Sequence, residues 1–177
     1  MSNTKNVIKV EERLAEMFKY LPQSVSVNGN ITLTPIFGYG DKKELNAFLK
    51  IKHTDRTRTP YPLIWLLYPY GENHSKTNVT VNGLSLILAT QTNASMGNVE
   101  RMNKTFNKVL FPLLDNINKL FIRANITSYN EEFELTKYPN YSDNESADEH
   151  AGIFIWDALK VDLDLTITDN CLKNIRF

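Results

Sequence analysis

The amino-acid sequence predicts an α+β fold, in which a mixed or antiparallel β-sheet carries an N-terminal helix and a long kinked helix. Three segments lead to this prediction. Residues 99–121 keep their apolar side chains on one helical face, which is typical of a long amphipathic helix. Residues 159–168 alternate between apolar and polar, as in a half-buried strand, and residues 63–68 lack polar alternation, as in a strand covered on both faces.

Length and composition set the limits of this fold. The chain has 177 residues, enough for one hydrophobic core, and we expect a single domain over residues 1–177. Charged residues make up 23% and the formal net charge is zero, which argues against a dedicated nucleic-acid or membrane-surface binder. Cys171 is the only cysteine, which excludes an internal disulfide and a cysteine-based zinc site. The N-terminus lacks a secretory apolar region, and no stretch reaches the roughly 18 apolar residues of a membrane span, so we expect a soluble, non-secreted protein.

The N-terminal region predicts a helix followed by a strand. The helix ends near Leu21, because Pro22 cannot continue it. The segment "ITLTPIFGYG" at residues 31–40 alternates like a strand, and Pro35 places that strand at an edge or a bulge. The apolar residues that recur at helical spacing in the first element are Val7, Val10, Leu14, Met17, Phe18 and Leu21.

A second, short helix follows. Asp41 and Glu44 have the spacing of a capping box, in which each side chain accepts a hydrogen bond from an otherwise unpaired amide at the helix start. We therefore expect a helix from residue 42 to about residue 50. The next segment, "KIKHTDRTRTP" at residues 50–60, is predicted to be a mostly basic loop.

Two long paired strands form the centre of the predicted sheet. The first is the apolar run at residues 63–68, and the loop "PYGENHSKTN" separates it from the second at residues 79–90. Apolar residues of the second strand stand at odd positions before Asn82 and at even positions after Gly83. An inserted residue would change the parity in this way, so we predict a β-bulge at these two residues.

The long helix comes next, with Ser95 and Asn98 as candidate capping residues. Pro112 lies inside it and is expected to kink the helix or to split it, because proline donates no backbone hydrogen bond. The segment "EEFELTKYPNY" predicts a further strand. Residues 139–152 are acidic and polar, and we interpret them as a flexible loop before the terminal strand.

Few residues suggest a catalytic or metal-binding site. Asp162 and Asp164 lie two apart on the terminal strand, so both carboxylates leave the same face, where they either bind a divalent cation or belong to a solvated surface. His53, His74 and His150 fall in polar segments, and none has metal-binding or nucleophile-activating spacing. The sequence contains no recognisable catalytic or nucleotide-binding motif. We therefore expect no enzyme activity, no cofactor and no metal.

Charge is segregated between two predicted loops. The basic loop contains Arg56 and Arg58, and either contacts phosphates, is simply solvated, or meets an acidic partner. We hypothesise that the basic loop of one subunit contacts the acidic loop of the next in a head-to-tail ring. The acidic residues of that candidate interface are Asp143, Glu145, Asp148 and Glu149.

The order of segments resembles the neck proteins of tailed bacteriophages. The similarity covers residues 45–167, and its most specific elements are "YPLIWL", "LATQTN" before the "ER" of the long helix, "VLFPLL", and "DAL" before the terminal strand. The pattern is similar to that of tail-terminator or tail-completion proteins and head-to-tail connector rings, including those of crAss-like and other phages of Bacteroidetes. The acidic insertion "NESADEH" departs from the pattern.

This resemblance implies a structural virion protein that is not an enzyme. Such a subunit is made in the host cytoplasm and forms a homo-oligomeric ring of about six or twelve copies in the neck. The ring contacts a portal or adaptor ring protein and a tail protein, and genomic DNA passes through its channel without specific binding. Asp162 and Asp164 are then candidates for the channel surface. The alternative is a small phage-encoded enzyme or ligand-binding protein that uses Asp162, Asp164 and a histidine as metal ligands.

Overall fold

The computed structural model describes residues 7–21, 25–27, 31–33, 35–54, 62–92, 95–126, 133–141 and 156–174. Within these residues, six strands form one mixed sheet in the order β3-β4-β6-β8-β7, with β5 paired to β6 beside this path. The β3–β4 pair is parallel and the other pairs are antiparallel. The predicted α+β fold is therefore confirmed. The strands are β3 (Ile36–Gly40), β4 (Leu63–Leu67), β5 (Gly71–His74), β6 (Asn78–Gln91), β7 (Glu134–Tyr141) and β8 (Trp156–Thr168).

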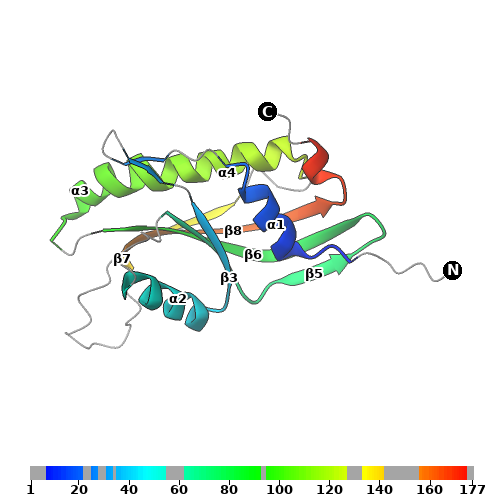
Figure 1. Ribbon diagram of the computed structural model, residues 1–177, viewed down its shortest axis with the longest axis horizontal. Coiled ribbons are helices and arrows are strands. Elements are labelled where there is room, and N and C mark those ends of the chain that lie inside the picture. Colours follow the sequence, from blue (N-terminus) through cyan, green and yellow to red (C-terminus); the bar gives the residue numbers. More distant parts are fainter. Residues whose placement is uncertain are drawn as a thin grey trace.

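Helices lie on both faces of this sheet. Figure 1 shows the long helix along one face, α2 over one end of the opposite face, and α1 beside β3. A separate antiparallel pair, β1 (Val25–Val27) with β2 (Ile31–Leu33), places β1 against the long helix. The helices are α1 (Val10–Phe18), α2 (Lys42–Thr54), α3 (Asn98–Arg101), the π-helix η1 (Met102–Leu110), α4 (Phe111–Arg123) and the 3₁₀-helix η2 (Cys171–Asn174).

The sheet separates two hydrophobic clusters. The larger one fills the space between the sheet and the layer of α1 and the long helix, and it includes Phe18 and Phe121, whose rings lie 6.1 Å apart. The smaller one lies under α2, where Leu45 is fully buried. The two clusters exist because successive side chains of a strand point to opposite faces. The buried members of the smaller cluster are Leu45, Leu63, Trp65, Ile87, Ala89, Trp156 and Ala158.

Strand β4 lies between β3 and β6 and is covered on both faces, as its apolar sequence predicts. Ile64 and Leu66 belong to the larger cluster, whereas Leu63 and Trp65 belong to the smaller one. The Trp65 ring leaves no room for a side chain on the neighbouring strand, because a Cβ atom at Gly38 would lie 2.6 Å from it. Glycine at this position therefore lets β3 pair closely with β4.

The predicted bulge in β6 is confirmed. The register between β6 and β8 shifts between Val81 and Leu84, and Gly83 has φ 66°, a left-handed conformation that favours glycine. The carboxylate of Asp164 accepts a hydrogen bond from the Gly83 amide at 2.6 Å. The shift returns apolar residues on both sides of the bulge to the same buried face.

The structure corrects the predicted boundaries at the N-terminal side. Helix α1 spans Val10–Phe18 and so ends before the predicted end near Leu21. The segment "ITLTPIFGYG" is not one strand: β2 and β3 belong to different sheets on either side of Pro35, which has no amide to continue a ladder. The capping box is confirmed, because Asp41 and Glu44 accept hydrogen bonds from each other's amides at 2.7 and 2.9 Å.

Two predicted loops contain regular structure. Residues 50–54 continue α2 instead of starting the basic loop, since lysine and isoleucine are compatible with a helix. Residues 71–74 form β5, which pairs with the first half of β6. The predicted start of the acidic loop at residue 139 is also wrong, because residues 139–141 form the end of β7. The remainder of that loop, residues 142–152, lies outside the described residues.

The long helix is continuous from α3 through η1 to α4, with a change of helix type near Pro112. The Phe111 amide still donates to the Phe106 carbonyl, five residues back, and regular α-helix begins at Phe111. Proline has no backbone N–H to donate, so Pro112 is compatible with a position where the helical hydrogen bonds change from one type to the other. Neither predicted cap is present: the extended N-cap residue is Gly97, which has no side chain to accept from the helix amides.

None of the helices in the described part of the chain combines the length and the apolar character that crossing a lipid bilayer requires.

Candidate functional site

The predicted acidic pair lies on the face of β8 that points away from the long helix. Asp162 accepts hydrogen bonds from Lys160 Nζ at 2.7 Å and from the Ser85 hydroxyl, and its contact with Lys160 raises the pKa of that lysine. Asp164 is exposed and accepts the Gly83 amide of the bulge. Both carboxylates thus have partners within the sheet.

No metal cluster accompanies this pair. Among the residues that the structure describes, no three side chains of histidine, cysteine, aspartate or glutamate come together as a metal site would require. His74 lies in β5, where its Nε2 is 2.6 Å from Glu72 Oε2. His53 lies in α2, and His150 lies outside the described residues.

The surroundings of the acidic pair form a polar half-face, defined here as Thr80, Ser85, Lys160, Asp162, Asp164 and Thr166. Thr80 and Thr166 share a hydrogen bond of 3.0 Å across β6 and β8. On β8, the half-face begins at Lys160, the next residue on this face after Ala158 of the smaller hydrophobic cluster. One end of this sheet face is therefore apolar and covered by α2, and the other end is polar.

The six loop residues of the candidate interface, Arg56, Arg58, Asp143, Glu145, Asp148 and Glu149, lie outside the described residues. The described residues that flank them are informative. Leu63, at the start of β4, pairs with Ala89, which in turn pairs with Ala158 near the start of β8. Both loops therefore join the sheet at the same end.

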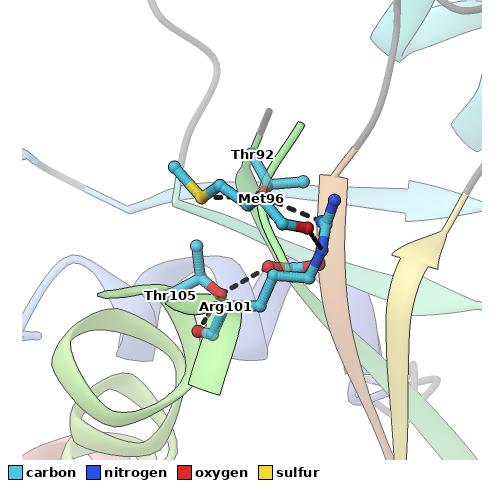
Figure 2. A network of polar contacts seen from close by, with 5 residues as sticks. Thr92, Met96, Arg101 and Thr105 are labelled. Carbon is cyan, nitrogen blue, oxygen red and sulfur yellow. Dashed lines mark hydrogen bonds and ion pairs between the residues drawn. The ribbon is translucent and has the colours of Figure 1, made fainter. Parts of the chain in front are cut away.

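A polar network lies at the start of the long helix, around the fully buried side chains of Arg101 and Asp157. Arg101 ends α3, and its Nη1 donates to Asp157 Oδ1 in β8 at 2.9 Å and to Thr92 Oγ1 at 3.0 Å. Its Nε donates to the Met96 carbonyl at 3.0 Å. Figure 2 shows these contacts, together with Thr105, whose hydroxyl contacts the Arg101 carbonyl at 2.7 Å and the second carboxylate oxygen of Asp157.

This network has a structural role. The side chains of Arg101 and Asp157 are both 0% exposed, so neither reaches a solvent-borne substrate. A buried guanidinium requires a paired anion and acceptors for its remaining N–H groups. The network connects Thr92 and Met96 to the start of the long helix, and it orients that helix on β8.

Sequence reasoning did not identify this pair, although a signal existed. Asp157 has the same odd parity as the buried residues of β8, so the alternation places an acid on the buried face. Arg101 and Thr105 stand eight and four residues before buried Val109, respectively, which places them on the buried face of the helix. Two opposite charges on facing buried surfaces imply that they pair.

A second group of polar residues surrounds an open depression between α1 and the β4–β5 connection. The depression has a volume of about 430 Å³ and is lined by Glu11, Tyr68, Pro69, Tyr70 and Glu72. The phenol groups of Tyr68 and Tyr70 each donate a hydrogen bond of 2.5 Å to Oε1 of Glu11. Glu11 is not among the candidate residues predicted from the sequence, so sequence reasoning missed this group.

The hydrogen bonds fix the protonation states of this site. Burial acts to raise the pKa of Glu11, but the bonds from Tyr68 and Tyr70 outweigh it and hold that pKa below its ordinary value. Burial, followed by the bond to the Glu11 carboxylate, raises the pKa of both tyrosines. At neutral pH the depression therefore contains an ionised carboxylate and two neutral phenols.

Neither a protein-family model nor a curated protein matches this chain, so its resemblance to phage neck proteins stays a prediction from the sequence.

Proposed function

We propose that this protein is a structural subunit of a homo-oligomeric ring in the neck of a tailed bacteriophage. The ring joins a portal or adaptor ring protein to a tail protein and surrounds the channel through which the genome passes. The proposal is supported by the sequence resemblance and by an α+β sheet whose elements follow the expected order.

The observation that carries the proposal is a sheet with two unlike open edges. Within the described residues, no strand pairs with the outer edge of β7 or of β3. Strand β7 has eight residues and lies at one end of the strand order, so its outer edge is a candidate for pairing with another chain. Contact between two different edges is head to tail, and such contacts close into a ring when the rotation between subunits permits it.

The polar half-face supports the same arrangement. Asp164 is exposed, and the hydrogen bond that it accepts comes from a backbone amide rather than from a cationic side chain. In the proposed ring this half-face lines the channel, where a negative surface repels the phosphates of passing DNA. Lys160 balances Asp162, which leaves Asp164 as the main carrier of that charge.

Reversal of the basic loop tests the interface. Arg56→Glu together with Arg58→Glu is expected to shift the protein from rings toward monomers and to reduce the salt dependence of assembly, because like charges then meet at the interface. Native mass spectrometry at several protein and salt concentrations measures both effects. Lys104→Glu with Lys119→Glu makes the same charge change on the exposed face of the long helix and is the matched control.

Two results would count against this interface. Unchanged assembly of the Arg56 and Arg58 variant rejects it directly. A loss of stability with no change in assembled mass places the effect of the two arginines within one subunit and also rejects the interface.

A further inference from the structure

We propose that the depression lined by Glu11, Tyr68, Pro69, Tyr70 and Glu72 binds a guanidinium group, presented either by an arginine side chain of another protein or by a small molecule. The inference does not depend on the proposed ring, because it rests only on the groups around this depression.

The first argument is the distribution of acceptors. Oε1 of Glu11 accepts both phenol protons, so neither tyrosine hydroxyl occupies Oε2. Glu72 contributes a second carboxylate, which contacts His74 through Oε2. The phenol protons are already directed at Glu11, so the side-chain oxygens of the depression are available only as acceptors. Such a site is complementary to a cationic donor.

The second argument is the aromatic surface. The rings of Tyr68 and Tyr70 lie 5.4 Å apart at 56°, and the ring of exposed Tyr39 lies 6.2 Å from that of Tyr68. The face of an aromatic ring attracts a cation electrostatically. Guanidinium is preferred to ammonium here because it is planar, stacks on rings and is more weakly hydrated.

The third argument is that the site is already organised. The bonds to Glu11 hold both phenol groups in place, so a ligand does not have to order them on binding. The depression is open and has a volume of about 430 Å³, which has room for a planar head group together with the chain that carries it. These features predict a weak, specific site with a dissociation constant on the order of 1 mM.

Nuclear magnetic resonance titration tests the proposal. Methylguanidinium and N-acetyl-arginine amide are expected to shift the ring resonances of Tyr68 and Tyr70 saturably, whereas N-acetyl-citrulline amide, a neutral analogue of the same shape, does not. Equal affinities for the two cations indicate a site for the head group alone, as a small molecule would use. Tighter binding of the arginine amide indicates a side chain presented by a protein.

Substitutions test whether the two carboxylates contribute to methylguanidinium binding. Glu11→Gln is expected to weaken methylguanidinium binding at least tenfold. Glu12→Gln changes the neighbouring residue of α1, whose side chain is 67% exposed and pairs with Lys9, and it is expected to leave binding unchanged. Glu72→Gln lies in exposed β5 and is expected to weaken binding without disturbing the core. This variant provides the test if Glu11→Gln unfolds the protein.

Three results would overturn the proposal. They are the absence of a saturable shift with either cation, an equal shift with the citrulline analogue, and an equal loss of binding in Glu12→Gln and Glu11→Gln.

Discussion

Replacing Asp157 with alanine is expected to lower the free energy of unfolding by about 3 to 5 kcal/mol. The change leaves the guanidinium of Arg101 fully buried without its counter-ion, with a smaller set of acceptors that includes the Thr92 hydroxyl and the Met96 carbonyl. A buried charge without its counter-ion costs far more than a lost surface pair. Urea denaturation followed by circular dichroism gives the free energy of unfolding.

Two comparisons isolate the cause. Asp115→Ala removes an exposed partner of Lys119 on α4 and is expected to cost about 0.5 kcal/mol or less. Arg101→Met combined with Asp157→Leu removes both charges, so it is expected to recover much of the stability lost in Asp157→Ala. If Asp157→Ala costs no more than Asp115→Ala, the buried ion pair does not hold the long helix on the sheet.

Leu66→Ala is expected to cost about 2 to 5 kcal/mol, because it opens a cavity in the larger cluster. Leu66 is 0% exposed at the middle of β4, where it pairs with Tyr39 of β3 and with Leu86 of β6. Neighbouring strands on both sides leave little room for the structure to relax into the cavity. The same denaturation experiment measures this effect.

An exposed apolar residue provides the control for this substitution. Ile122 is 70% exposed near the end of α4, so Ile122→Ala is expected to change stability by about 0.5 kcal/mol or less. A near-neutral result for Leu66→Ala would mean that β4 is not a central strand.

Local patterns in the sequence predicted the elements that depend on local chemistry. The parity change around Gly83 located the bulge, since a period of two allows no other simple explanation. The capping box of Asp41 and Glu44 located the start of α2. The unbroken apolar run of β4 predicted a strand covered on both faces.

Other features depend on contacts that no local pattern contains. The parallel pairing of β3 with β4 depends on the direction in which the chain returns after α2 and on the space at Gly38, and no local pattern contains either. The π-helical bonding of η1 keeps a helical spacing of apolar residues and so looks like an α-helix in sequence. The exact ends of α1 and α2 depend on packing, which overrides propensity.

The candidate sites were the hardest to predict for the same reason. Asp162 and Asp164 were correctly placed together on one strand face, but their partners Ser85 and Gly83 come from β6, far away in the sequence. Glu11 meets Tyr68 and Tyr70 only because α1 packs beside the sheet, 57 and 59 residues away along the chain. A site formed by segments that are distant in the sequence can be identified only when the fold is known.

Electron cryo-microscopy of the purified protein, and of the phage particles that contain it, tests the central proposal most directly. We expect closed rings of constant subunit number, with the polar half-face of β6 and β8 toward an open channel. Some ring subunits assemble only on the growing particle, so the particle neck is examined even if the isolated chain is monomeric. A protein that stays monomeric at high concentration and is absent from the neck of the particle would contradict the proposed function.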